Sequence, residues 1–168
     1  MIELTGDIPE LAMEWRNHPD IWSWCRQNNI LTQADQDRWL ERIKNDSSIQ
    51  MYGIRVLPDR ELVGVCGLTS INYHHRTAEF SLYIAPEHQG NGYGTLALKG
   101  LLDYGFNRLN LQCIWGEVME ENPALEIFLK IGFALGTKCR SRYFKERKYI
   151  NSYQIDMLAS EYNERYYA

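Results

Sequence analysis

The stretch from residue 77 to residue 107 constrains the fold more than any other part of the chain. Apolar and polar residues alternate over residues 77–85, which predicts a strand with Ala78, Phe80, Leu82 and Ile84 on one side and Thr77, Glu79, Ser81 and Tyr83 on the other. Residues 92–107 carry apolar side chains three and four positions apart, which predicts a helix with one apolar face. The residues of that face are Tyr93, Leu96, Ala97, Gly100, Leu101 and Tyr104. A strand leading through a turn into an amphipathic helix is typical of mixed α/β folds.

Strand and helix patterns continue on both sides of this stretch. Residues 49–56 and 61–72 flank the turn residues Pro58 and Asp59, which predicts a hairpin. Residues 62–66 are apolar without alternation, as expected of a strand covered on both faces. Further strands are expected at 111–119, 133–143 and 147–158, with a helix at 123–131. The first 45 residues are expected to be mostly helical, with helix starts near residues 7–9 and near Thr32 and an irregular aromatic piece at 21–24.

The turn between the predicted strand and helix contains Gly90, Gly92 and Gly94 within five residues. Glycines let successive backbone N–H groups point into one concavity, and the helix N-terminus behind them adds a partial positive charge. The pattern fits a site for a phosphate or pyrophosphate, although it also fits a turn without a ligand. A P-loop is excluded because the Gly-Lys-Ser/Thr ending is missing, and the late position of the turn disfavours a dinucleotide-binding Rossmann site.

Composition narrows the class of protein. The 168 residues contain no divider between domains, so we expect a single domain over residues 1–168. A formal charge of −4 disfavours sequence-independent nucleic-acid binding. No apolar run reaches the length of a membrane span and the first residues are acidic rather than leader-like, so we expect a cytoplasmic protein without a membrane partner. The four cysteines form no metal-binding or disulfide pattern, and no metal site is predicted.

Residues 89–94, Gln-Gly-Asn-Gly-Tyr-Gly, match the Q/R-x-x-G-x-G/A motif of the GNAT (Gcn5-related) N-acetyltransferases. Residues 71–80, 84–90, 102–104, 109–111, 121–123 and 132–133 extend the match. In these parts the chain resembles the bacterial spermidine acetyltransferases and ribosomal-protein-alanine acetyltransferases, with coverage from about residue 10 to 158. The resemblance implies an α/β fold with helices on both faces of a mostly antiparallel sheet. It also implies that the sheet splays between its fourth strand, at 77–85, and its fifth, at 111–119.

The resemblance further implies that acetyl-CoA is the co-substrate. Its pantetheine arm would enter the splayed gap and its pyrophosphate would lie on the glycine turn. The implied cofactor-binding residues are Ile84, Ala85, Gln89, Gly90, Asn91, Gly92, Tyr93, Gly94, Thr95, Asn122 and Lys130.

An amine acceptor must lose a proton before it can attack a thioester, because an alkyl ammonium has a pKa near 10. Glu79 is the candidate base, since it lies on the polar side of its strand and the resemblance places it at a position used as base in several GNAT enzymes. The alternative is an exposed glutamate paired with Arg76. In the family a tyrosine often protonates the departing thiolate, but Phe128 occupies that place here. Tyr83 is our candidate for a catalytic tyrosine; Tyr143, Tyr149 and water are the other options.

The acceptor is left open among a polyamine, an amino-sugar nucleotide and a protein N-terminus. Residues 138–148 hold six bases and one acid, which fits either a solvated hairpin face or a rim that selects an anionic acceptor. A polyamine requires carboxylates, yet residues 25–29 contain Arg26 and no acid, whereas the following helix offers Asp35, Asp37, Glu41 and Asp46. A non-catalytic acyl-CoA-binding module is the alternative function, and a homo-oligomer is compatible with the sequence.

Overall fold

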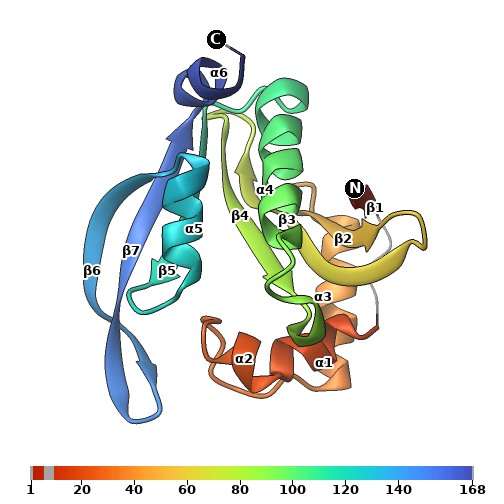
Figure 1. Cartoon of the computed structure of the whole chain (residues 1–168). Helices are drawn as coiled ribbons and strands as arrows, with labels where there is room; N and C mark the ends of the chain where they lie inside the picture. The colour runs from red at the N-terminus through yellow and green to blue at the C-terminus, as the bar shows by residue number, and fades with distance from the viewer. Residues whose placement is uncertain (1, 6–9, 168) are drawn as a thin grey trace.

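A seven-stranded sheet forms the centre of the molecule (Figure 1). The computed structural model describes residues 2–5 and 10–167. The strands lie in the order β1-β2-β3-β4-β5-β7-β6, and all neighbours are antiparallel except the parallel pair β4 and β5. Their bounds are β1 Ile2–Thr5, β2 Gln50–Val56, β3 Glu61–Asn72, β4 Thr77–Ile84, β5 Cys113–Met119, β6 Ala134–Lys145 and β7 Lys148–Leu158. The mixed, mostly antiparallel sheet confirms the predicted fold class.

Helices pack on both faces of this sheet. They are α1 Ala12–Asn17, α2 Pro19–Trp22, α3 Gln33–Asn45, α4 Tyr93–Asp103, α5 Ala124–Ile131 and α6 Ala159–Tyr167. A π-helical turn, Tyr104–Arg108, continues α4, and a short 3-10 helix, Pro86–His88, precedes it. The predicted start of α3 is confirmed, because Thr32 and Asp35 form a reciprocal capping box there. Within the described ranges, no helix combines the length and hydropathy that a membrane crossing requires.

Two apolar layers hold the helices to the sheet. The larger layer joins α4, α5 and α6 to one face through residues such as Leu98, Leu101 and Phe128. The smaller layer joins α1, α2 and α3 to the other face and includes Trp15 and Tyr83. In β3 the successive residues Val65 and Cys66 enter opposite layers, and neither is exposed. This confirms the strand covered on both faces that the unbroken apolar run predicts.

The termini differ from the prediction. Residues 2–5 form an edge strand paired with β2 in a region expected to be helical, because four residues are too few to show a strand period. The expected helix start at residues 7–9 lies outside the described residues. A short helix, α2, occupies part of the piece expected to be irregular. Helix α6 had no counterpart in the prediction, and its tyrosine Tyr162 is buried against the larger layer.

The buried stripe of α4 is also rotated from the predicted one. Ala97, Leu98, Leu101 and Leu102 are fully buried, whereas Leu96 is 47% exposed. Apolar residues cover more than half of the circumference of this helix, so two stripes fit the same period. Packing against the sheet selects the stripe that contains Leu98 and Leu102.

Candidate active site

The parallel strands β4 and β5 are paired over only three residues each. The partners are Thr77 with Cys113, Ala78 with Ile114, and Glu79 with Trp115. Beyond this point β4 continues to Ile84 and β5 to Met119, and the two strands diverge (Figure 1). The splay predicted between the fourth and fifth strands is thereby confirmed. A strand edge released from its neighbour offers backbone N–H and C=O groups to an extended ligand.

A cavity of about 470 Å³ occupies the opened gap, within the usual size range of small-molecule sites. One wall is formed by Leu82 and Ile84 of β4 together with the glycine turn. Asn122 and Phe128 of α5 form the opposite wall. Trp24, which follows α2, also lines the cavity. The cavity therefore joins the free edge of β4 to the start of α4.

The glycine turn has the backbone conformation that an anion site requires. Gly90 and Gly92 both have φ of +78°, a left-handed conformation that favours glycine. Gly92 is the N-cap of α4 and provides no side-chain cap, so the first amides of the helix remain for another acceptor. The Asn91 amide donates to the carbonyls of His88 and Gln89 at 3.1 and 3.3 Å, which braces the turn from within. The Gln89 side chain donates to the Ile84 carbonyl at 3.2 Å and ties the turn to β4.

The other predicted cofactor-binding residues lie in three different surroundings. Ile84, Tyr93, Gly94, Thr95 and Asn122 line the cavity. The backbone N–H and C=O of Ala85 already bond to Val63 and His88 at 2.8 and 2.9 Å, so we assign Ala85 no contact with a ligand. Lys130 is 79% exposed at its side chain and lies in a neighbouring cavity rather than in this one.

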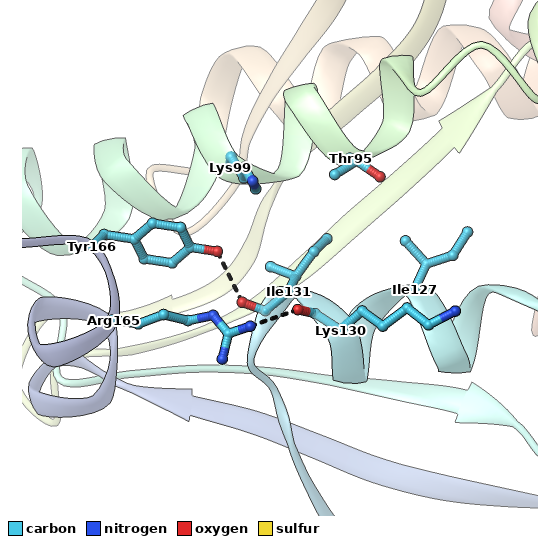
Figure 2. A pocket seen from close by; sticks show the side chains of 7 residues that line it. All are labelled: Thr95, Lys99, Ile127, Lys130, Ile131, Arg165 and Tyr166. Atoms are coloured by element: carbon cyan, nitrogen blue, oxygen red, sulfur yellow. Dashed lines mark hydrogen bonds between the residues drawn. The ribbon is translucent and has the colours of Figure 1, made fainter.

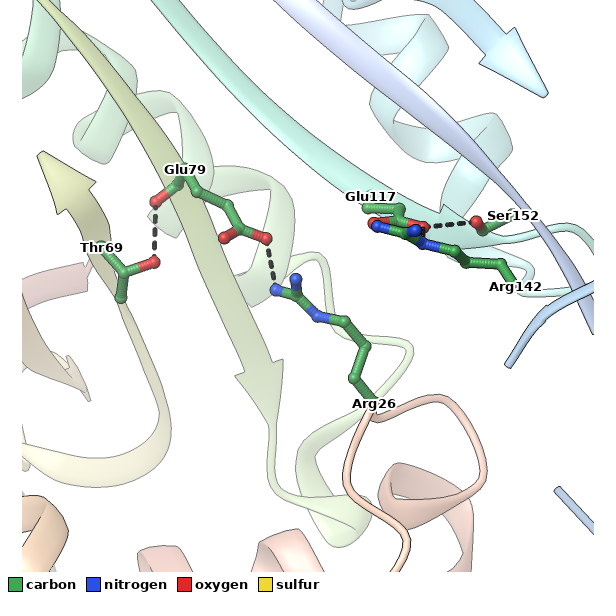
Figure 3. A network of polar contacts seen from close by, with 6 residues as sticks. All are labelled: Arg26, Thr69, Glu79, Glu117, Arg142 and Ser152. Carbon is green, nitrogen blue, oxygen red and sulfur yellow. Dashed lines mark hydrogen bonds and ion pairs between the residues drawn. The ribbon is translucent and has the colours of Figure 1, made fainter. Parts of the chain in front are cut away.

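Glu79 is buried, with only 6% of its surface exposed. Its carboxylate forms an ion pair with Arg26, which reaches it from the loop between α2 and α3 (Figure 3). The alternative of an exposed glutamate paired with Arg76 is therefore wrong. Arg76 instead donates to the Asn110 carbonyl at 2.5 Å. The polar side of β4 is not a solvent face, because the N-terminal helices and their loops cover it.

A second buried carboxylate, Glu117 on β5, faces the same side of the sheet as Glu79. Glu79 is in register with Trp115, and Glu117 follows two residues later, so its side chain points in the same direction. It accepts hydrogen bonds from Ser152 Oγ at 2.5 Å and Arg142 Nε at 3.2 Å (Figure 3). Burial opposes its charge, but these hydrogen bonds, with one from Tyr143, outweigh it and lower the pKa of Glu117. Glu117 was not among the residues predicted from the sequence, although the alternation along β5 indicates a polar side chain on this face.

The positive charge of Arg26 interacts with both carboxylates. Burial opposes its charge, yet Glu79, and more weakly Tyr143 and Glu117, raise the pKa of the guanidinium above its ordinary value. Its side chain is half exposed. This face of the sheet thus holds two acids, each paired with an arginine.

The candidate proton donors have distinct surroundings. Tyr83 lines the cavity, but its hydroxyl points to the Ala12 carbonyl at 3.5 Å and burial raises the pKa of that hydroxyl. Tyr143 is bound to Glu117, and Tyr149 is 70% exposed. Phe128 lines the cavity with its ring edge-on to Phe80, at 5.1 Å between centroids. As catalytic residues, Glu79 and Tyr83 stay predictions.

Some of the histidines and tryptophans line the cavity, whereas others contact side chains elsewhere. The rings of His74 and His75 lie edge to face in the exposed turn before β4. His88 lines the cavity, and its Nε2 lies 3.6 Å from the Glu61 carboxylate. Trp22 lies under the Lys145 ammonium, 4.1 Å from its ring centroid, and Trp24 reaches the cavity. Among the described residues, no group of three or more His, Cys, Asp or Glu is arranged to hold a metal ion.

Comparisons with known proteins agree with this geometry. A family model described as an acetyltransferase (GNAT) domain matches residues 2–134. The spermidine N(1)-acetyltransferase of Vibrio cholerae is 37% identical over 107 residues, which cover 63% of this chain and 62% of that protein. The match thus spans less than two thirds of that relative. A ribosomal protein bS18-alanine N-acetyltransferase of Haemophilus influenzae is 28% identical over 91 residues, or 54% of this chain and 60% of that protein.

A solved structure matches over nearly the whole chain. It is the spermidine N-acetyltransferase of Vibrio cholerae in complex with CoA and spermine, with a TM-score of 0.89 and 27% identity. The superposition covers 96% of this chain and 97% of that one.

Proposed function

Because this chain belongs to the GNAT acetyltransferase family, we propose that it transfers the acetyl group of acetyl-CoA to a primary amine. One observation carries the proposal: the pairing of β4 with β5 stops at Glu79 and Trp115 and opens a cavity. The cavity runs from Leu82 of β4 to the first amides of α4, and Glu79, three residues before Leu82 on the same strand, does not line it. An extended thioester carrier with a pyrophosphate requires both a free strand edge and such a helix start.

The chain's own groups fit the two polar parts of that carrier. The edge of β4 at Ile84 would pair with the amides of the pantetheine arm, as the family resemblance implies. The amides from Gln89 to Thr95 would bind the pyrophosphate, and Asn122 lies on the opposite wall. When bound, acetyl-CoA supplies an acyl thioester that an amine can attack.

Glu79 is proposed to take the proton from the acceptor ammonium, directly or through a water molecule. The carboxylate lies on the face of β4 that the α2–α3 loop covers, and its present partner is the Arg26 guanidinium. A cationic acceptor competes with this guanidinium for the same carboxylate. Since Arg26 is half exposed, it can turn into solvent when the acceptor binds.

A polyamine is the acceptor class to test first, because relatives named for spermidine match this chain in sequence and in fold. The buried carboxylates Glu79 and Glu117 would suit cationic amines, but each is paired with an arginine. Because both acids are already neutralised by arginines, the other two acceptor classes, amino-sugar nucleotides and protein N-termini, stay in the proposal.

The test is release of free thiol from acetyl-CoA with spermidine, an N-terminal peptide and an amino-sugar nucleotide as acceptors. We expect release with at least one of them and a calorimetric signal for CoA. Binding of CoA without release from any acceptor would instead support the non-catalytic acyl-CoA-binding module, which the phenylalanine at position 128 favours. Absence of CoA binding would contradict both functions.

Phe128→Tyr is expected to raise kcat by about fivefold, because it adds a hydroxyl at the cavity wall that can protonate the departing thiolate. Steady-state kinetics with the best acceptor of the panel measures this. Phe133→Tyr is the matched control, since Phe133 also packs on Phe80 but is buried in the core, where a hydroxyl gains no access to the reaction. An unchanged kcat in Phe128→Tyr would mean that a hydroxyl at this position does not protonate the thiolate and that another tyrosine, such as Tyr83, or water serves as the donor.

The proposal includes a cytoplasmic location, as expected from the sequence. Acetyl-CoA is an intracellular co-substrate, and all four cysteines are free thiols.

A further inference from the structure

Two arginines cover the two buried acids on the Glu79 side of the sheet (Figure 3). The side chains of Glu79 and Glu117 are only 8% and 4% exposed, whereas those of Arg26 and Arg142 are 50% and 54% exposed. Arg26 reaches Glu79 from the loop between α2 and α3, and Arg142 reaches Glu117 from β6. An acceptor that approaches this face therefore meets guanidinium groups before it meets either carboxylate.

Strand β6 is distorted at the point where it presents Arg142. Ser141 has φ of +51°, and the pairing of β6 with β7 shifts its register just before Tyr143. The Ser141 N–H donates to Asn151 Oδ1 at 2.9 Å and fixes the distortion. Neighbours in a regular strand point to opposite faces, yet Arg142 and Tyr143 both bind Glu117. Bulges re-aim side chains in this way, and here the result is a guanidinium held beside the acid of β5.

Both guanidinium groups keep N–H donors for a ligand. Arg26 donates to Glu79 through one Nη, and Arg142 donates to Glu117 through Nε and is also bonded to Tyr143. Because a guanidinium carries five N–H donors, each arginine retains several. The Tyr143 hydroxyl, which is bonded to Glu117 and Arg142, also interacts with the charge of Arg26. The two arginines therefore belong to one polar cluster.

The surface beside this cluster is positively charged. Residues 138–148, which form the end of the β6–β7 hairpin, contain six bases and one acid. Among these bases, Arg140, Arg147 and Lys148 are exposed. Charges of one sign around an opening attract ligands of the opposite sign. The hairpin therefore favours the approach of an anionic group.

The two arginines lie apart from the cavities. Neither lines the cavity that we propose for acetyl-CoA, and neither lines the neighbouring cavity between α4, α5 and α6 (Figure 2). The cations of that neighbouring cavity are Lys99, Lys130 and Arg165. Arg26 and Arg142 therefore remain available to the acceptor.

We propose that Arg26 and Arg142 bind an anionic group, a carboxylate or a phosphate, that the acceptor carries close to its amine. The inference rests on the proposed function, because it takes Glu79 to receive the ammonium group. As that ammonium replaces the Arg26 guanidinium at Glu79, the anion of the same molecule becomes the new partner of Arg26. Guanidinium groups form strong charge-assisted hydrogen bonds with both kinds of anion. A polyamine would leave the displaced guanidinium without an anion.

The test uses pairs of acceptors that differ in an anionic group. Phosphoethanolamine is compared with ethanolamine, glucosamine 6-phosphate with glucosamine, and β-alanine with β-alaninamide, and spermidine is the polycationic reference. Release of free thiol from acetyl-CoA gives kcat/KM for each. We expect the wild type to favour the anionic member of at least one pair, and to favour it over spermidine, by about tenfold. The phosphate and carboxylate pairs show which anion is bound.

Arg26→Gln is expected to act in opposite directions on the two kinds of acceptor. It should lower kcat/KM for the anionic acceptor by about tenfold, because the anion loses its guanidinium. It should raise kcat/KM for spermidine by about threefold, because Glu79 loses the cation with which spermidine competes. Arg142→Gln should lower the value for the anionic acceptor by about fivefold. Arg108→Gln is the matched control, since Arg108 is exposed at the end of the π-helical turn after α4, and it should change neither value.

Three results would count against the inference. If the wild type used the anion-free members or spermidine as well as the anionic ones, the inference would be wrong and the proposed function would stand. Equal loss with every acceptor in Arg26→Gln would show that Arg26 only holds Glu79 in place, which would also overturn the inference. Absence of transfer to any amine would overturn the proposed function and this inference together.

Discussion

Replacing Glu79 with glutamine is expected to lower kcat at neutral pH by about 10²- to 10⁴-fold, the usual contribution of a positioned general base. Glutamine has nearly the same shape but cannot take a proton from the acceptor ammonium. The loss should shrink as the pH rises toward the pKa of the free amine, near 10, because a growing fraction of acceptor then arrives neutral. The pH dependence of kcat for wild type and variant measures both effects.

The controls for this variant address its ion pair with Arg26. Arg26 is half exposed and can be solvated when its partner is lost, so the melting temperature of Glu79→Gln should stay close to that of the wild type. Glu164→Gln makes the same chemical change at an exposed position of α6 and should leave kcat unaltered. If Glu79→Gln retained the wild-type rate and pH profile, the pairing of Glu79 with Arg26 would be structural and the proton would have to leave by another path.

The sequence predicted best those features that depend on local periodicity. The hairpin of β2 and β3, the start of α3 at Thr32 and the glycine turn before α4 all rest on residues close together in the chain. The splay between β4 and β5 came from family resemblance instead. The two strands are more than 30 residues apart in the chain. No local sequence pattern indicates where the pairing between such strands ends.

The features that the sequence could not predict depend on long-range contacts. Glu79 and Arg26 are 53 residues apart, and Arg26 belongs to a loop whose path no period describes. Glu117 gains its partners Ser152 and Arg142 only when β6 and β7 complete the sheet. Helix α6 is held by a hydrogen bond from Arg165 to the Lys130 carbonyl at the end of α5, and such docking has no sequence period.

The arginine partners change what the two buried acids offer to an acceptor. An unpaired buried carboxylate would attract any cationic amine, whereas one already paired binds only a cation that can displace the guanidinium. The chain therefore combines a fold shared with spermidine-named relatives with two buried acids whose charges are balanced by arginines. This is the physical reason why the acceptor panel must include amines that carry anionic groups as well as polyamines.

Gly92→Val is expected to raise the Kd for CoA by roughly ten- to thirtyfold. Gly92 has φ of +78°, and a β-branched residue is strongly disfavoured there, by roughly 1–2 kcal/mol or more. Steric room is not the obstacle, because a Cβ at this position meets no atom within 4 Å. The substitution therefore shifts the backbone, and with it the first amides of α4 that we propose to hold the pyrophosphate. Calorimetric titration with CoA measures the change.

Gly92→Asn separates backbone conformation from side-chain bulk. Asparagine is close to valine in size but tolerates the left-handed conformation far better, so it should retain most of the affinity. Gly100→Ala supplies a second control, because Gly100 is exposed inside α4 and alanine there should stabilise the helix without altering CoA binding. Equal weakening by valine and asparagine would show that added bulk in front of the turn, rather than the direction of its amides, controls affinity. Unchanged affinity in both variants would remove the turn from the cofactor site.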